Sequence, residues 1–183
     1  MYRLNIGCGE YLLEGFENCD ENPAMPASIH YHAPPIPRED GSVDEIWACH
    51  VLEHMDYHEG GEFLAECYRV LVSGGGIGVV VPDTREIMRR YLSGAPDCVE
   101  FPLGQWNPIS NLDEVCALFL YSTRQESPHR WSYDRDTLAR AMATAGFRGF
   151  KEIDRYRDPR LGSPVWYQCG IQGVKPGEGG VTQ

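Results

Sequence analysis

The sequence predicts an α/β protein with a mainly parallel sheet covered by helices. Segments with strand patterns and amphipathic helical segments follow one another along the chain. The run IGVVVPD, residues 77–83, is continuously apolar, as strands buried on both faces of a parallel sheet are. A glycine turn, Gly7-Cys8-Gly9, follows directly on the first predicted strand.

Four strands are predicted in the first part of the chain. They are short, apolar or alternating segments bounded by turn residues, at 3–6, 15–20, 28–32 and 43–49. The second of them ends at an acid, Asp20. The segment 34–42, PPIPREDGS, is predicted as a loop from its proline, glycine and serine content.

Helices are predicted on either side of the IGVVVPD strand. Apolar residues at three- and four-residue steps predict one within 50–72, starting at Gly60-Gly61 and stopped by SGGG, residues 73–76. A short basic helix, REIMRRYL, follows the strand. A helix within 134–147 has Asp134 or Asp136 as its N-cap and Gly146 as its C′ glycine. Two closing strands, FKEIDRY and VWYQCGIQGV, would form a hairpin.

The length of 183 residues suits a single domain. We expect this domain to span residues 1–175, with a lid-like insertion at about 84–128 that closes over a substrate. The polar, glycine-rich residues 176–183 predict a flexible tail.

Composition and charge narrow the classes of protein. The net charge of −11 lies wholly in residues 1–70, which hold 14 acidic and 3 basic residues. A nucleic-acid partner is therefore disfavoured, because phosphate binding needs clustered cations. No apolar run is long enough to cross a membrane. Seven scattered cysteines without a CxxC pair indicate reduced thiols in a cytoplasmic protein.

The glycine turn is placed as a nucleotide-binding turn is, at the exit of a strand. Glycines let a ligand approach the backbone closely, and Asp20 could accept hydrogen bonds from both hydroxyls of a ribose. The full G-x-G-x-x-G pattern of dinucleotide sites is absent because residue 12 is leucine.

Several motifs occur together in one order along the chain. They are LNIGCG at 4–9, GFENCD at 15–20, DGSVDEI at 40–46, HVLEH at 50–54, RVLVSGGGIGVVVPD at 69–83, and HRWSYD at 129–134 followed by AGF at 145–147. With them the chain resembles the class I S-adenosylmethionine-dependent methyltransferases, and within these the short bacterial group with LNxGCG and HVLEH motifs. The resemblance spans about residues 3–174.

The resemblance implies a Rossmann-like, seven-stranded sheet with an antiparallel last strand and helices on both faces. It also implies S-adenosylmethionine as the cofactor, with Gly7 and Gly9 at the methionine part, Asp20 at the ribose, and Cys49 and His50 near the sulfonium. The cofactor-binding residues that it assigns are Asn5, Gly7, Cys8, Gly9, Asp20, Cys49, His50 and Glu53. Many relatives carry an adenine-binding acid after the third strand, where this chain has Tyr31-His32.

HVLEH also reads as H-x-x-E-H, the inverted signature of zinc peptidases. That site needs both histidines on one helical face, whereas the predicted strand 43–49 ends directly at His50. We therefore assign no metal ligands. A metal held by the cluster of His50, Glu53, His54, Asp56 and His58 stays open as an alternative.

Methyl transfer to oxygen usually needs a base beside the strand ends. The candidates for catalysis are His129, Asp83 and His50. Asp83 could instead cap the following helix, and His129 could be a loop histidine bonded to a carbonyl.

The sequence thus predicts a cytoplasmic enzyme that methylates a small-molecule or sugar-type acceptor at oxygen. The alternatives are a zinc-dependent hydrolase that uses HVLEH and a non-catalytic module that only binds the cofactor.

Overall fold

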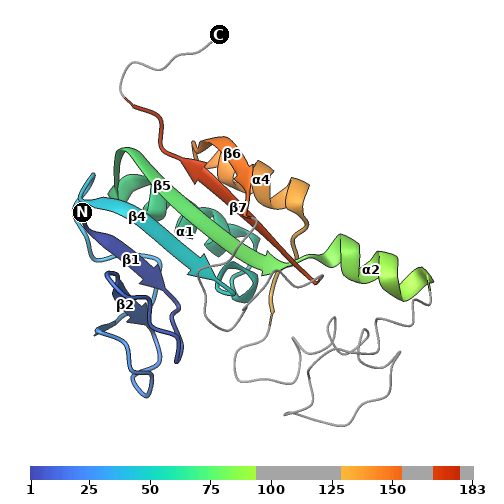
Figure 1. The fold of residues 1–183 in the computed structure, drawn as a ribbon, viewed down its shortest axis with the longest axis horizontal. Helices are drawn as coiled ribbons and strands as arrows, with labels where there is room; N and C mark the ends of the chain where they lie inside the picture. Colours follow the sequence, from blue (N-terminus) through green and yellow to red (C-terminus); the bar gives the residue numbers. More distant parts are fainter. Residues whose placement is uncertain (94–128, 154–166, 178–183) are drawn as a thin grey trace.

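The computed structural model describes residues 1–93, 129–153 and 167–177. Their centre is a seven-stranded sheet with the order β3-β2-β1-β4-β5-β7-β6 (Figure 1). The first five strands run parallel, and β7 is antiparallel to both β5 and β6. The strands are β1 (Arg3–Ile6), β2 (Glu17–Asp20), β3 (Ile29–His30), β4 (Val43–Cys49), β5 (Leu71–Pro82), β6 (Arg148–Glu152) and β7 (Gln168–Val174). The predicted α/β fold is confirmed.

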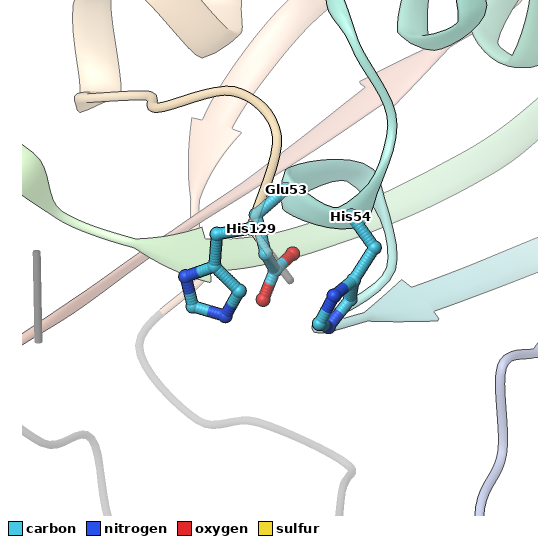
Figure 2. Close-up of side chains that lie close together, drawn as sticks. All are labelled: Glu53, His54 and His129. Carbon is cyan, nitrogen blue, oxygen red and sulfur yellow. The ribbon is translucent and has the colours of Figure 1, made fainter. Parts of the chain in front are cut away.

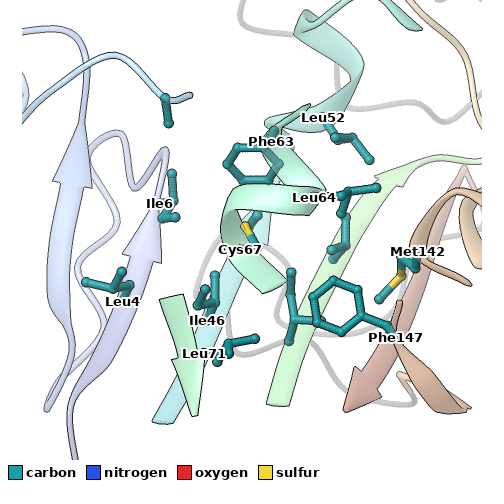
Figure 3. Packing of buried hydrophobic residues seen from close by; sticks show 14 of the residues in the cluster. Leu4, Ile6, Ile46, Leu52, Phe63, Leu64, Cys67, Leu71, Met142 and Phe147 are labelled. Carbon is teal, nitrogen blue, oxygen red and sulfur yellow. The ribbon is translucent and has the colours of Figure 1, made fainter. Parts of the chain in front are cut away.

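Two helices cover one face of this sheet. They are α1 (Tyr57–Val70) and α4 (Arg135–Thr144), which contact each other and share one apolar core with the strands (Figures 1 and 3). α1 contributes Phe63, Leu64 and Cys67, and α4 contributes Leu138 and Met142, all fully buried. Each large apolar side chain buried in this way stabilises the fold by about 1.5–3 kcal/mol. A smaller core of Trp47, Cys49, Val80 and Ile153, with Leu13 and Phe16 against it, forms a second cluster.

The start of α1 differs from the prediction. The helix begins at Tyr57, one turn before the expected Gly60-Gly61, because Asp56 and Glu59 form a capping box. The Asp56 carboxylate accepts hydrogen bonds from the amides of His58 and Glu59 at 2.9 and 3.0 Å, and Glu59 Oε2 accepts one from the Asp56 amide at 3.0 Å. Gly60 serves close packing instead, since a Cβ there would lie 2.9 Å from the Tyr133 hydroxyl.

The sequence predicts that SGGG, residues 73–76, separates α1 from β5. This prediction is wrong in part. β5 begins at Leu71, directly after α1, and runs to Pro82. Its pairing with β4 jumps from Val43↔Leu71 to Glu45↔Gly76. The residues 72–75 therefore bulge out within the strand and do not precede it.

The last described elements follow the predicted order. Asp134 is the N-cap of α4, and its Oδ1 accepts a hydrogen bond from the Thr137 amide at 2.8 Å. Gly146 follows the C-cap of α4 with a φ of 110°, as expected for a C′ glycine. The two closing strands are present as β6 and β7, paired antiparallel.

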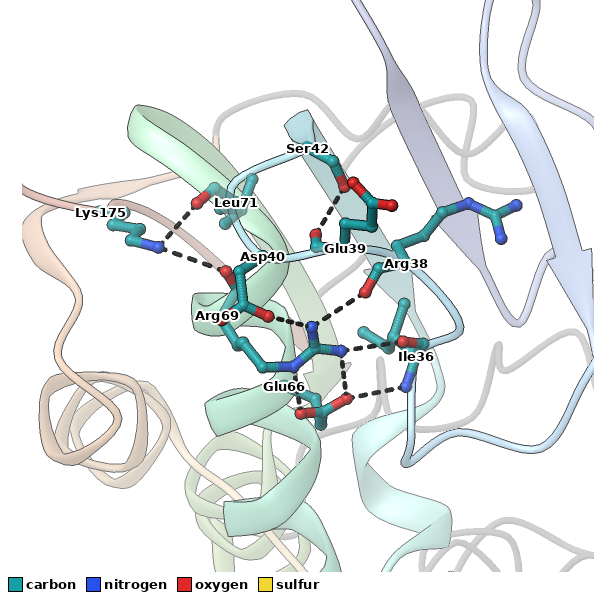
Figure 4. Close-up of polar contacts among 9 residues, drawn as sticks. All are labelled: Ile36, Arg38, Glu39, Asp40, Ser42, Glu66, Arg69, Leu71 and Lys175. Atoms are coloured by element: carbon teal, nitrogen blue, oxygen red, sulfur yellow. Dashed lines mark hydrogen bonds and ion pairs between the residues drawn. The ribbon is translucent and has the colours of Figure 1, made fainter.

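A network around the half-buried Arg69 joins the proline-rich loop to α1 (Figure 4). The Arg69 guanidinium donates to both carboxylate oxygens of Glu66, to Asp40, and to the carbonyls of Ile36 and Arg38. Glu66 Oε2 also accepts a hydrogen bond from the Ile36 amide at 3.0 Å. The network holds the chain that leads from β3 into β4.

Part of the predicted organisation lies outside the described residues. The short basic helix is present as α2 (Thr84–Ser93). The remainder of the lid-like insertion, 94–128, and the end of the tail, 178–183, fall outside, so the lid and the flexible tail stay predictions. Within the described ranges no helix is long and apolar enough to cross a membrane.

Candidate active site

The glycine turn lies at the carboxyl end of β1. Gly7 and Gly9 have φ angles of 66° and 53°, in the left-handed region that glycine adopts without strain. A Cβ at Gly7 would lie 2.3 Å from Val51 Cγ2, so this position also has no room for a side chain. Between the glycines, the amide of Cys8 donates to the Cys19 carbonyl at 3.0 Å and ties the turn to β2.

Asp20, at the end of β2, is held by the turn beside it. Its Oδ2 accepts a hydrogen bond from the Gly9 amide at 2.8 Å, and its Oδ1 accepts one from the Asn22 amide at 2.9 Å. Each carboxylate oxygen keeps a further lone pair for a ligand. The carboxylate is thus fixed in position before any ligand binds.

A cavity of about 570 Å³ opens at this end of the sheet. Its walls come from the ends of β1 and β2 and from the segments that follow β3 and β4. Among the residues that line it are Gly7, Gly9, Asp20, Tyr31, His50 and His54. Ligands of open parallel sheets bind in this place, outside the carboxyl ends of the strands.

His50 lies directly after β4 in a strained conformation. Its φ of 57° is the one positive value of a non-glycine residue in the described part of the chain. Its Nδ1 is 2.7 Å from Glu53 Oε1, and its Nε2 is hydrogen-bonded by the Gln168 amide group. With Nδ1 donating to the carboxylate, both ring nitrogens are engaged and the imidazole is held in one orientation.

Glu53 is almost fully buried, at 1% exposure, below two further histidines. Figure 2 shows its carboxylate between His54 and His129, whose ring centroids are 4.9 Å apart. Burial raises the pKa of the Glu53 carboxyl, but the charge and hydrogen bond of His50, with His54 and His129, outweigh it, so the pKa is lowered overall. Burial lowers the pKa of His129, the charge of Glu53 opposes this effect, and the charges of His54 and His50 add to it, so the pKa is lowered overall. A buried carboxylate and a neutral His129 result at neutral pH.

HVLEH does not form the helix that the zinc-peptidase site requires. Its helical part is the 3₁₀ turn η1 (Leu52–His54), and His50 precedes that turn with positive φ. The expectation that His50 and His54 do not share a regular helical face is confirmed.

The remaining predicted residues have structural partners. Asn5 is buried and donates to Asn18 Oδ1 at 2.8 Å. Cys8 and Cys49 are buried thiols, and Cys49 packs with Trp47 away from the cavity walls. Asp83 Oδ1 accepts a hydrogen bond from the Glu86 amide at 3.1 Å, which is the N-capping role. The structure does not test a role in binding or catalysis for these four.

Two residues of the site were not predicted from the sequence. Gln168 bonds His50 from a position 118 residues later in the chain. Arg130 lines the cavity and forms ion pairs with Asp56, at 2.9 Å, and Glu59. Gln168 belongs to no motif, whereas Arg130 lies within HRWSYD, which could have indicated it.

Residues 10–79 match the methyltransferase domain family. The match covers less than half of the chain; it begins directly after the Gly7–Gly9 turn and includes Asp20, HVLEH and α1. No curated protein matches the sequence. The domain match and the fold together support an S-adenosylmethionine-dependent methyltransferase, with S-adenosylmethionine as the cofactor.

Solved structures of such methyltransferases share the fold at low sequence identity. One, from Thermotoga maritima and described as a possible histamine N-methyltransferase, has 17% identity and a TM-score of 0.60, covering 95% of this chain and 82% of its own. Another, from Archaeoglobus fulgidus, has 16% identity and a TM-score of 0.56 over 95% and 86%. Phosphoethanolamine N-methyltransferase 2 of Haemonchus contortus, in complex with S-adenosyl-L-methionine, has 12% identity and a TM-score of 0.57 over 96% and 49%.

Proposed function

We propose that this chain transfers the methyl group of S-adenosylmethionine to an oxygen atom of a small-molecule or sugar-type acceptor. The observation that carries the proposal is the cavity at the strand ends, which brings the Gly7–Gly9 turn, Asp20 and two histidines together. The turn and Asp20 suit the cofactor, and His54 contacts His129, which could take the proton of an oxygen acceptor. The net charge of −11 disfavours a nucleic acid as the acceptor.

The cofactor would lie across the ends of β1 and β2. Its methionine part would lie against the backbone of Gly7 and Gly9, which lines the cavity. Asp20 would accept hydrogen bonds from the ribose hydroxyls through the lone pairs that the Gly9 and Asn22 amides leave open. Tyr31 and His32 line the same cavity and would contact the adenine.

Methyl transfer is an in-line displacement at the methyl carbon. The carbon–sulfur bond breaks with its electron pair left on sulfur, a carbon–oxygen bond forms, and the acceptor hydroxyl loses its proton. Much of the rate would come from alignment of the two reactants in the cavity. The proton needs a base.

Of the three candidates for the base, His129 fits best. Its pKa is lowered by burial, so the ring is neutral at neutral pH. It packs against His54, which lines the cavity. His50 has both ring nitrogens engaged, and Asp83 caps α2. We therefore propose His129 as the base, with His50 and Glu53 as its support.

The seven cysteines are scattered along the chain without a CxxC pair, a pattern that suits reduced thiols. We therefore propose the reducing cytoplasm as the location of the enzyme.

Two measurements test the proposal. Calorimetry should detect binding of S-adenosylmethionine and of its demethylated product. Asp20→Asn should weaken the binding of both. Glu39→Gln is the control and should leave both unchanged, because Glu39 is exposed on the loop 34–42 and does not line the cavity. With methyl-labelled cofactor and a panel of hydroxylated acceptors and matching amines, label should appear on a hydroxyl. Absence of cofactor binding contradicts the methyltransferase function, and label on amines alone contradicts the oxygen acceptor.

A further inference from the structure

One oxygen of the buried Glu53 carboxylate lacks a partner. Oε1 accepts the hydrogen bond from His50, but Oε2 has no hydrogen-bond partner among the described residues. The side chain is 1% exposed, so water in bulk does not solvate this oxygen. A buried, charged oxygen without a partner destabilises the fold unless a ligand binds it.

The imidazoles of His54 and His129 lie beside this oxygen, where a ligand of the carboxylate would bind. Among the described residues, Glu53, His54 and His129 each offer one donor atom, and these atoms all lie within 4.8 Å of one another. In Figure 2 the two rings and the carboxylate face a common space. Donors about 2.1 Å from one ion are separated by roughly 3–3.5 Å, so an ion would draw this set inward by about 1 Å.

The backbone keeps the three groups together. The Glu53 carbonyl accepts hydrogen bonds from the amides of Arg130 and Trp131 at 2.7 and 3.2 Å, which hold the segment of His129 above η1. The Arg130 side chain adds ion pairs to Asp56 and Glu59 at the start of α1. The cluster is therefore built from two distant parts of the chain that bind each other independently of any ion.

We propose that Glu53, His54 and His129 bind one divalent first-row transition ion, such as Zn²⁺ or Co²⁺. Two imidazoles and one carboxylate suit these ions, whereas Mg²⁺ prefers oxygen ligands alone. His50 acts one shell further out, because its Nδ1 orients the carboxylate through Oε1. Three protein ligands leave coordination positions open, and His54 directs them toward the cavity that it lines.

The role of the ion rests on the proposed function. An acceptor hydroxyl bound at an open position would lose its proton to solvent more readily, since the ion stabilises the oxyanion. The oxyanion then attacks the methyl carbon, and the sulfur keeps the electron pair of the broken bond. In the metal-bound protein His129 is a metal ligand and not the base, and the ion promotes deprotonation of the acceptor hydroxyl in its place.

Metal binding can be measured without cofactor or acceptor. Untagged protein freed of metal with a chelator is titrated with ZnCl₂ by calorimetry and with CoCl₂ by visible absorption. The wild type should bind one ion per chain and show the d–d bands of a site with nitrogen ligands. His54→Gln, His129→Gln and Glu53→Gln should each lose more than about 100-fold in affinity. His50→Gln should lose about 10- to 100-fold, because His50 orients the carboxylate of a ligand without binding the ion itself.

His58→Gln is the matched control, because His58 is exposed and lies outside the three-residue cluster. Its affinity should equal that of the wild type, and circular dichroism should show that every variant is folded. The inference is overturned if the wild type binds no ion, or if the folded His54→Gln and His129→Gln variants bind as tightly as the wild type. Calorimetry of the metal-free protein with S-adenosylmethionine tests the proposed function separately, so either can fail alone.

Discussion

The turn after β1 allows its two glycines to be compared by one substitution each. Gly7→Ala and Gly9→Ala both place a Cβ on a left-handed backbone, with φ of 66° and 53°. At Gly7 the new Cβ would lie 2.3 Å from Val51 Cγ2, whereas at Gly9 it would meet nothing within 4 Å. The two variants therefore share the backbone penalty and differ by one steric clash.

The expected magnitudes follow from this difference. The left-handed backbone costs an alanine about 1–2 kcal/mol, which is the whole expected loss in unfolding free energy for Gly9→Ala. Overpacking costs about 1–3 kcal/mol more, so Gly7→Ala should lose roughly 2–5 kcal/mol. Val51→Ala removes the clashing methyl and leaves the Val51 Cβ 3.6 Å away, an ordinary contact. The double variant should recover the 1–3 kcal/mol of overpacking.

Urea unfolding of the wild type, Gly7→Ala, Gly9→Ala, Val51→Ala and the double variant measures these terms. The coupling energy between positions 7 and 51 should equal the cost of the clash. Equal losses at Gly7 and Gly9, or a coupling below about 0.5 kcal/mol, would refute the reasoning, because independent sites add within that margin.

Three further outcomes are expected. Asp20→Asn should weaken cofactor binding by about 10- to 100-fold, since hydrogen bonds to charged groups contribute about 1.5–3 kcal/mol, and calorimetry that finds no change would contradict its role. The hydrogen bonds of Arg69 lower the pKa of Glu66 from 4.5, so Glu66→Gln should cost about 2 kcal/mol of unfolding free energy at neutral pH. This difference from the wild type should fade as the pH falls through the lowered pKa, because wild-type Glu66 then takes up a proton itself. Urea unfolding at several pH values measures the difference. Burial raises the pKa of Cys19 to about 11 and of Cys169 to about 12, so iodoacetamide should label both thiols only after denaturation. Mass spectrometry measures the labelling, and rapid labelling of the native protein would contradict this prediction.

The positions of the strands along the chain could be predicted, because each strand carries a local sequence pattern. VDEIWAC is β4 without a residue of error, and the acid that ends GFENCD is the last residue of β2. The N-terminus of α1 was missed although its signal was present. Asp56 and Glu59 have the spacing of a capping box, but apolar periodicity alone pointed to the glycines three residues later.

Contacts between distant segments could not be predicted in this way. Gln168 reaches His50 because β7 inserts beside β5, and only the sheet order places the two together. His129 lies beside Glu53 and His54 because the backbone amides of Arg130 and Trp131 bind the Glu53 carbonyl, 77 and 78 residues earlier in the chain. Neither contact has a spacing that a single sequence reveals.

The pentapeptide HVLEH has a different geometry here from that of a zinc-peptidase helix, and His50 is the reason. On a regular helix its two histidines would lie one turn apart on one face and could hold an ion between them. The positive φ of His50 turns the chain into η1, so the ring of His50 bonds Glu53 and Gln168. The ring that lies beside His54 is that of His129, from a distant part of the chain. A sheet that presents this segment at its carboxyl edge can thus combine a cofactor cavity with a three-residue ligand set, and the two chemistries that the pentapeptide suggests need not exclude each other.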